Sequence, residues 1–235
     1  MTTNDRVQWA WLRAVPDEPR WVEIRAMLLH PGSNVLGEPQ GGLVVDVDRS
    51  VAGVVGQPAE PLLAQAFAIL SADAELLVPA ESIGHVAALV PEGTARRAVV
   101  HTLGSQLPAP DDADVDLSVV DAPFLSSLPE ELAEEARGAK WAAARRVDGS
   151  AVSICTAWWI TERHWDVGVD TLPEHQRQGH ARSCFLTLAD HLAGHSLQPV
   201  WGAFEDNVAS LGMAAGLGFV PDGEIWVVDD LRRSA

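Results

Sequence analysis

The order of apolar segments after residue 140 limits this chain to few folds. Three runs with strand composition come first and lie close together: Trp141–Val147, Ala151–Ile160 and His164–Thr171. Helix-like and strand-like segments then alternate, in the order Gln176–Gly194, Val200–Phe204, Asn207–Leu217 and Glu224–Val228. Short hairpins join antiparallel strands, whereas a helix between two strands joins parallel ones. We therefore predict a mixed α/β sheet with flanking helices.

The first hundred residues contain a second set of α and β segments. We predict a hairpin at Gly42–Val47 and Val51–Val55, because Asp48-Arg49-Ser50 between them is a typical turn. A helix, a strand, a helix and a strand are then expected at Pro61–Leu70, Ala74–Val78, Ser82–Leu89 and Ala95–Leu103. Neither a catalytic motif nor an internal repeat is visible, so the sequence does not indicate the role of this half.

A stretch rich in proline and aspartate, Leu107–Asp114, cannot continue a helix or a central strand. We therefore place a linker near residue 110. The expected domains are a smaller α/β domain over residues 1–110 and a second domain over residues 111–235. The second domain is predicted to begin with a short strand at Ser118–Val120 and a helix at Leu128–Arg137.

The charge balance excludes several classes of partner. Lysine and arginine total 16 against 33 aspartates and glutamates, which gives a formal net charge of −17. Phosphates are repelled by such a polyanion, so we expect neither nucleic acid nor an anionic membrane as a partner, whereas cationic small molecules are favoured. The two cysteines, Cys155 and Cys184, do not have the spacing of a metal site, and we expect no metal.

We expect no segment that directs this chain into or across a membrane. Its longest apolar runs, such as Ala151–Ile160, are about half the ~20 residues of a membrane helix. The first residues have no long apolar core of a secretory signal. We expect a cytoplasmic, soluble protein, and a homodimer is compatible with the sequence.

The segment from Trp165 to Ala181 combines a strand, a turn and the start of a helix. Backbone amides at a helix start have no partner within the helix, and the helix dipole adds positive charge there. Gly179 and Ala181 remove side-chain bulk at this place, while Arg177 and Arg182 add charge. This combination is suited to hold a pyrophosphate.

This segment resembles the acyl-coenzyme A signature of the GNAT superfamily of N-acetyltransferases. The signature is Arg/Gln-x-x-Gly-x-Gly/Ala, which here reads Gln176-x-x-Gly179-x-Ala181 after Pro173. A second family block is matched by Asn207, Ser210 and Leu217-Gly218-Phe219. The resemblance covers about residues 115–230 and includes the spacing between the blocks.

The resemblance implies transfer of an acetyl group from acetyl-coenzyme A to an amine. The implied coenzyme-binding residues are Val169, Asp170, Thr171, Gln176, Arg177, Gln178, Gly179, His180, Ala181, Asn207 and Ser210. The sequence departs from the family at one position, because Ala214 stands where many members have a tyrosine that protonates the departing thiolate. That departure favours a rival interpretation, a non-catalytic module that binds acyl-coenzyme A.

An amine must lose a proton before it attacks a thioester, so a base is needed. We choose Asp166, because strand alternation places it with Gly168 and Asp170 on one face, and relatives often have an acid there. The alternative is a structural carboxylate that solvates an edge of the sheet or pairs with Arg163. Glu162 and Glu205 are the next candidates.

Other chemically able residues have a simpler interpretation. His191 and His195 have the spacing of two metal ligands on a helix, but no third ligand is evident, so we interpret them as a solvated face. The cysteines lie among apolar residues and are expected to pack as such. The tryptophans Trp158, Trp159, Trp165 and Trp201 are expected in the core, although one that faces the acceptor could stack on a cation.

Overall fold

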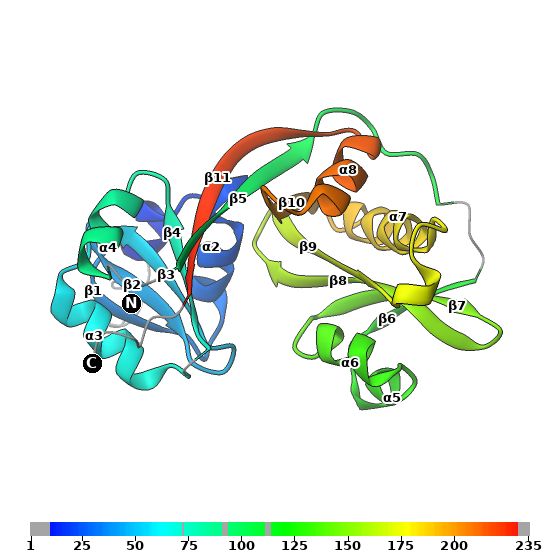
Figure 1. The fold of residues 1–235 in the computed structure, drawn as a ribbon, viewed down its shortest axis with the longest axis horizontal. Helices are drawn as coiled ribbons and strands as arrows, with labels where there is room; N and C mark the ends of the chain where they lie inside the picture. Colours follow the sequence, from blue (N-terminus) through cyan, green and yellow to red (C-terminus); the bar gives the residue numbers. More distant parts are fainter. Residues whose placement is uncertain (1–9, 72, 91–93, 111–113, 230–235) are drawn as a thin grey trace. The chain divides into compact units, whose positions relative to one another are not determined.

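The computed structural model describes residues 10–71, 73–90, 94–110 and 114–229 (Figure 1). They form two compact units. The first comprises residues up to 101, residues 202–208 and those from 221 onward, and the second comprises 102–201 and 209–220. This division differs from the expected one at 110, because the last strand of the chain pairs within the first unit. Whether each part is an independent domain stays a prediction.

The second unit is built on a mixed sheet, as predicted. Its strands lie side by side in the order β6 (Val115–Val119), β7 (Trp141–Val147), β8 (Ser150–Ile160), β9 (His164–Thr171) and β10 (Gln198–Phe204). Pairing is antiparallel from β6 to β9, whereas β9 and β10 are parallel. The last residues of β10 belong to the first unit.

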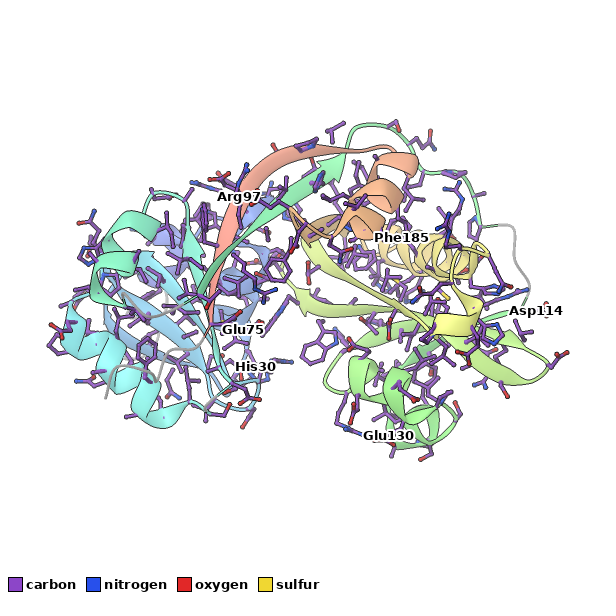
Figure 2. The ribbon with its side chains drawn as sticks, viewed as in Figure 1. His30, Glu75, Arg97, Asp114, Glu130 and Phe185 are labelled. Carbon is purple, nitrogen blue, oxygen red and sulfur yellow. The ribbon has the colours of Figure 1, made fainter. Side chains whose placement is uncertain are left out.

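Helices cover both faces of this sheet (Figure 1). They are α5 (Ala122–Ser126), α6 (Glu130–Ala136), η2 (Pro173–His175), α7 (His180–Ala193) and α8 (Val208–Gly216). Phe185 lies between α7 and the strands (Figure 2), where its ring is 6.1 Å from Trp165 and 5.5 Å from Trp201 between centroids. On the opposite face, the Trp158 indole N–H donates to the Glu135 carbonyl of α6 over 2.8 Å.

The strands of the first unit do not lie side by side in the order in which they occur in the sequence. Its elements are η1 (Pro19–Trp21), α2 (Val22–Leu29), β1 (Asn34–Glu38), β2 (Gly41–Asp46), β3 (Val51–Gly56), α3 (Glu60–Ile69), β4 (Glu75–Pro79), α4 (Ile83–Leu89), β5 (Thr94–Leu103) and β11 (Phe219–Asp229). The strands run in the order β1-β2-β3-β4-β11, followed by β5. The hairpin, both helices and both later strands were predicted, whereas α2 and β1 were not. No helix among the described residues is long and apolar enough to cross a membrane.

The two halves of the chain repeat one order of elements. A helix, three antiparallel strands, a helix, a parallel strand, a helix and a last strand occur first from α2 to β5 and again from α6 to β11. In each half the parallel pair is registered over three residues, Val51–Gly53 with Glu75–Leu77 and His164–Asp166 with Gln198–Val200. The repeat is therefore one of topology, which the sequence did not reveal.

One helix begins later than predicted. The expected helix Gln176–Gly194 starts only at His180. Arg177 and Gly179 have φ angles of 61° and 88°, and such left-handed residues cannot continue a right-handed helix. Residues 176–179 therefore form a loop.

Candidate active site

The loop between β9 and α7 is held by two of its own amide side chains. Gln176 Nε2 donates to the Thr171 carbonyl over 3.2 Å, and Gln178 Nε2 donates to the Glu174 carbonyl over 3.1 Å. The short helix η2 lies between them. These bonds fix the path of the chain into α7.

The N-terminus of α7 is open to an anion. Gly179 is its N-cap residue, no side chain of the described residues caps its amides, and no acidic residue stands in its first turn. A Cβ placed on Gly179 would meet no atom within 4 Å. His180 and Ala181 form the first turn, beside Arg177 and the exposed Arg182. Free amides, the helix dipole and two arginines together fit a pyrophosphate.

One edge of β9 is available to a ligand. The strand pairs with β10 only over His164–Asp166, and among the described residues no further pair with β10 follows. Its other edge stays paired with β8 as far as Thr171. Val169 and Asp170 therefore have an edge on which an extended ligand could lie. The amide of Thr171 is already used, because it donates to Asp170 Oδ1 over 2.8 Å.

Asp166 lies on the face of β9 opposite the aromatic core. Its neighbours Trp165 and Val167 are buried on the side of α7, whereas Asp166 is partly exposed on the other side. Burial of its carboxyl raises the pKa of Asp166 to about 7, and a backbone hydrogen bond at Val167 opposes this less strongly. A carboxylate with this pKa can accept a proton near neutral pH.

The two alternative bases have different surroundings. Glu205 lies in the first unit, where its Oε2 is 3.2 Å from Arg97 Nη1. The same Arg97, labelled in Figure 2, contacts Glu224 through Nε over 2.6 Å. Glu162 is exposed. The ion pair engages Glu205 with Arg97, and Asp166 stays our candidate for the base.

The second sequence block is divided between the two units. Asn207 is exposed in the first unit, directly before α8. Ser210, in the second unit, accepts a hydrogen bond from the Trp201 indole over 2.9 Å. Ala214 is fully buried, so the position where relatives have a tyrosine faces the core of this protein.

The histidines and cysteines of this unit have structural surroundings. His191 lies 4.5 Å from the Trp141 ring and 5.0 Å from His195 between centroids. Within the described part of the chain, no three metal-binding side chains come together. Both Cys155 and Cys184 are fully buried, and burial raises the pKa of the Cys155 thiol, which keeps it protonated.

Several side chains that share the face of Asp166 were missed by sequence reasoning. Thr156 on β8 pairs with Gly168 on β9, and a side chain at Gly168 would overlap the Thr156 hydroxyl. Glu135 of α6 is close enough to Asp170 for the two charges to interact. Alternation along β8 alone could not reveal this group, because the register between strands decides which side chains meet.

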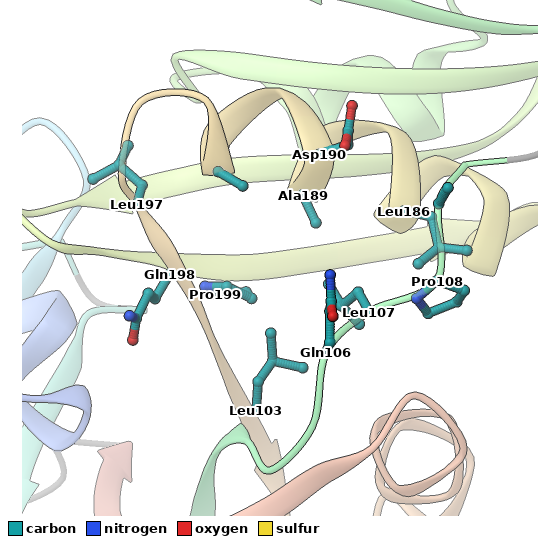
Figure 3. Close-up of a pocket in the computed structure, with 12 residues that line it drawn as sticks. Leu103, Gln106, Leu107, Pro108, Leu186, Ala189, Asp190, Leu197, Gln198 and Pro199 are labelled. Carbon is teal, nitrogen blue, oxygen red and sulfur yellow. The ribbon is translucent and has the colours of Figure 1, made fainter.

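A separate cavity of about 380 Å³ lies beside the second half of α7 (Figure 3). Its apolar lining consists of Leu103, Leu107, Pro108, Ala109, Leu186, Ala189, Ala193, Leu197 and Pro199. Gln106, Gln198 and Asp190 complete the lining. The lining includes no residue of the loop before α7 and one ionisable group, so we do not assign the cavity to the reaction.

Solved structures share this fold over nearly the whole chain. A GCN5-related N-acetyltransferase-like protein from Streptococcus suis has a TM-score of 0.68 at 15% identity, with 96% of each chain covered. A GNAT-family protein from Novosphingobium aromaticivorans has a TM-score of 0.66 at 16% identity, with 90% of this chain and 97% of that chain covered. A tandem GNAT protein from the clavulanic acid biosynthesis pathway has a TM-score of 0.59 at 14% identity, with 99% and 97% covered.

A search of curated proteins found no match. A family model described as GNAT acetyltransferase matches residues 142–227, which include the loop before α7, Asp166 and α8. The match, the fold and the two sequence blocks agree, so residues 142–227 are similar to GNAT acetyltransferases.

Proposed function

We propose that this protein transfers an acetyl group from acetyl-coenzyme A to an amine, by direct attack of the amine in a ternary complex. The open N-terminus of α7 at Gly179 carries the proposal, because it combines free amides, positive charge and space for a phosphate. The similarity to GNAT acetyltransferases supports acyl transfer as the reaction.

The coenzyme would be held at two places along the chain. The loop and the first turn of α7 would bind its pyrophosphate through Gln176, Arg177, Gln178, Gly179, His180 and Ala181. The free edge of β9 would pair with its pantetheine arm at Val169 and Asp170, which fixes the distance from phosphate to acyl group. Acetyl-coenzyme A supplies the activated thioester. Asn207 and Ser210 stay candidates for further contacts with acetyl-coenzyme A.

Asp166 would accept the proton that makes the amine a nucleophile. An alkylammonium ion has a pKa near ~10, so most of the amine arrives protonated. One proton passes to Asp166, directly or through water, and the nitrogen lone pair then forms the bond to the acyl carbon. As the carbon–sulfur bond breaks, its electrons leave with sulfur, and the second ammonium proton neutralises the thiolate.

The methyl side chain of Ala214 has no acidic proton to give to the sulfur. A thiol pKa of roughly 8–9 makes the thiolate a tolerable leaving group near neutral pH. Removal of the proton from the amine is therefore the step that most needs a side chain of the protein.

The proposed acceptor is cationic, because a net charge of −17 attracts ammonium groups and repels anions. Cytoplasmic location, a homodimer and the absence of nucleic acid or membrane partners stay predictions from the sequence. The rival function, acyl-coenzyme A binding without transfer, is favoured by the buried Ala214.

A single assay separates the two functions. The protein is given acetyl-coenzyme A with a panel of amines, and both thiol release and the mass of the amine product are measured. We expect an acetylated amine and a matching amount of thiol. Calorimetric binding of acetyl-coenzyme A without any acetylated product would favour the rival, and absence of binding would contradict both.

A further inference from the structure

A buried serine on β8 contacts the start of the loop that leads into α7. Ser153 is completely buried and stands opposite Thr171, the last residue of β9. Its hydroxyl donates to the Asp170 carbonyl over 2.9 Å and lies 2.7 Å from the Thr171 hydroxyl. A serine hydroxyl carries one proton, so the Thr171 hydroxyl donates to Ser153 while Ser153 donates to Asp170. One side chain of β8 therefore holds the end of β9.

The backbone of the same serine contacts the helix that follows the loop. Cys184 of α7, which is also completely buried, donates its thiol proton to the Ser153 carbonyl over 3.5 Å. The first amide of the loop, that of Leu172, donates to the neighbouring Val152 carbonyl over 3.0 Å. The loop thus starts and returns beside one short segment of β8.

Thr171 connects this segment to the motif that we assign to the pyrophosphate. Besides its hydroxyl, its amide donates to Asp170 Oδ1 over 2.8 Å, and its carbonyl accepts from Gln176 Nε2 over 3.2 Å. The hydroxyl, the amide and the carbonyl of Thr171 therefore all have partners. A chain of hydrogen bonds runs from the buried Ser153 through Thr171 to Gln176, the first residue of the motif.

We propose that Ser153 is a positioning residue, which sets the distance between the edge of β9 and the N-terminus of α7 and thereby the affinity for coenzyme A. This inference rests on the proposed function, in which β9 binds the pantetheine arm and α7 binds the pyrophosphate. Both groups belong to one ligand, so a protein that already holds the two places at the right separation binds it more tightly. Backbone amides cannot adjust by rotation of a side chain, so their position depends on such contacts.

Two acyl donors of different length test the role of Ser153. Acetyl-coenzyme A has both the pantetheine arm and the pyrophosphate, whereas S-acetylpantetheine has only the arm. Ser153→Ala should weaken binding of acetyl-coenzyme A to the full chain by about 10-fold, the equivalent of one hydrogen bond, as measured by calorimetry. With acetyl-coenzyme A, KM should rise and kcat should stay within about twofold, because only uniform binding is lost. The KM for S-acetylpantetheine should not change.

Ile154→Val is the matched control for a general loss of stability. It removes buried volume from the next residue of β8, which packs on the opposite face in the apolar cluster of Phe124, Leu132 and Ala136. The affinity for acetyl-coenzyme A should stay within about twofold, because the change removes no hydrogen bond of the loop.

Thr171→Val removes the other hydroxyl of the pair and keeps the shape of the side chain. It should weaken binding of acetyl-coenzyme A as Ser153→Ala does. The two changes together should weaken binding no further, because both remove the same contact. Thr171 is only partly buried, so this variant keeps the test decisive if Ser153→Ala does not fold.

Hydrogen exchange provides a reading that needs no ligand. In Ser153→Ala, the amides of residues 172–184 should exchange faster by about 5-fold or more, because the loop opens more often. In Ile154→Val they should exchange at the rate of the parent.

The outcomes distinguish this inference from the proposed function. Unchanged exchange in Ser153→Ala, or equal losses of acetyl-coenzyme A affinity in Ser153→Ala and Ile154→Val, would overturn the positioning role and leave acetyl transfer intact. Equal losses for acetyl-coenzyme A and S-acetylpantetheine would also overturn it, since the effect would not pass through the pyrophosphate loop. Absence of acetyl-coenzyme A binding by the parent would instead overturn the proposed function itself.

Discussion

The chemistry proposed for Asp166 depends on one property of one residue, its raised pKa of about 7. Asp166→Asn keeps the size of the side chain but cannot accept a proton. We expect kcat to fall by ~10²-fold or more, with affinity for coenzyme A unchanged, because the pyrophosphate loop lies elsewhere. In the parent, kcat/KM should rise with pH through about 7.

Turnover of Asp166→Asn equal to that of the parent between pH 6 and 9 would make Asp166 a structural carboxylate. Glu162 would be tested next. A calorimetric titration with coenzyme A serves as the control for folding.

The raised pKa of Asp166 also predicts that the folded protein becomes less stable as the pH rises. Asp166 titrates near 7 when folded but near ~3.9 when unfolded, so between these pH values the folded protein binds one more proton. Its stability should therefore fall as pH rises through this window, by up to about 1.4 kcal/mol per pH unit. Asp166→Asn removes this term, and its stability relative to the parent should increase from pH 5 to pH 7.

Urea unfolding of both proteins at pH 5, 6, 7 and 8 measures this difference. A difference in unfolding free energy that stays constant with pH would show that Asp166 has an ordinary pKa.

Two features favour glycine at position 179. Its backbone is left-handed, and the space beside it is open where a phosphate would lie. Gly149, in the hairpin between β7 and β8, shares both its positive φ of 83° and the lack of any atom within 4 Å of a Cβ. Alanine at either position should cost roughly 1–2 kcal/mol of stability. We expect only Gly179→Ala to weaken coenzyme A binding, by about 10-fold, as measured by calorimetry. Equal affinities of the two variants would remove the loop from the site.

At the scale of elements, two strand-to-helix connections occupy corresponding places in the repeated topology. The one from β9 to α7 spans residues 172–179, whereas the one from β3 to α3 spans only residues 57–59. Helix α3 also begins with Glu60 and Pro61, which add a negative charge and remove an amide. The first half therefore lacks the features to which we assign phosphate binding in the second half.

The corresponding strand face is also filled. Gly53 is the third residue of its parallel pair, as Asp166 is in the second half. A Cβ on Gly53 would lie 2.6 Å from Ile24 Cγ1 and 3.0 Å from Met27 Cε of α2. Apolar side chains thus occupy the place that corresponds to Asp166, the proposed base of the second half.

Because the two halves differ in this connection and in this strand face, we predict that each chain binds one molecule of coenzyme A. Calorimetry should give a stoichiometry near one, and Gly179→Val should abolish that binding. Pro61→Ala, which changes the corresponding helix start in the first half, should leave both affinity and stoichiometry unchanged. Two coenzymes per chain would contradict the comparison of the two connections.

At the scale of the whole molecule, the last strand ties the C-terminal residues to the first unit. Strand β11 pairs with β4 from Ile225 to Val228. Arg96 contacts Asp229 over 2.9 Å at the end of this strand. A chain cut at residue 110 would lose β4 and β5, which are neighbours of β11 in the sheet.

We therefore expect the fragment 111–235 to lack cooperative thermal unfolding, whereas the full chain should unfold cooperatively. Circular dichroism during heating measures this. A fragment that unfolds cooperatively and binds coenzyme A like the full chain would restore the boundary near residue 110 that the sequence suggests.

Local sequence patterns were sufficient to predict much of the fold. Strands β7 and β9 have the predicted bounds, because alternating apolar residues and flanking turns are properties of the chain itself. The Gln176-x-x-Gly179-x-Ala181 motif likewise identified the loop before α7. The predicted start of α7 at Gln176 was wrong. The left-handed backbone of Arg177 is set by the loop, and the type of its side chain does not reveal it.

The sequence by itself determined the mixed sheet of the second unit and the resemblance to GNAT acetyltransferases, because the sheet follows from periodicity and the resemblance from motifs a few residues long. Only the tertiary structure decided the repeated topology, the return of β11 to β4, and the place of Thr156 opposite Gly168. Each of these depends on which strands pair and in what register. Such contacts join residues far apart in the chain, so no local pattern records them.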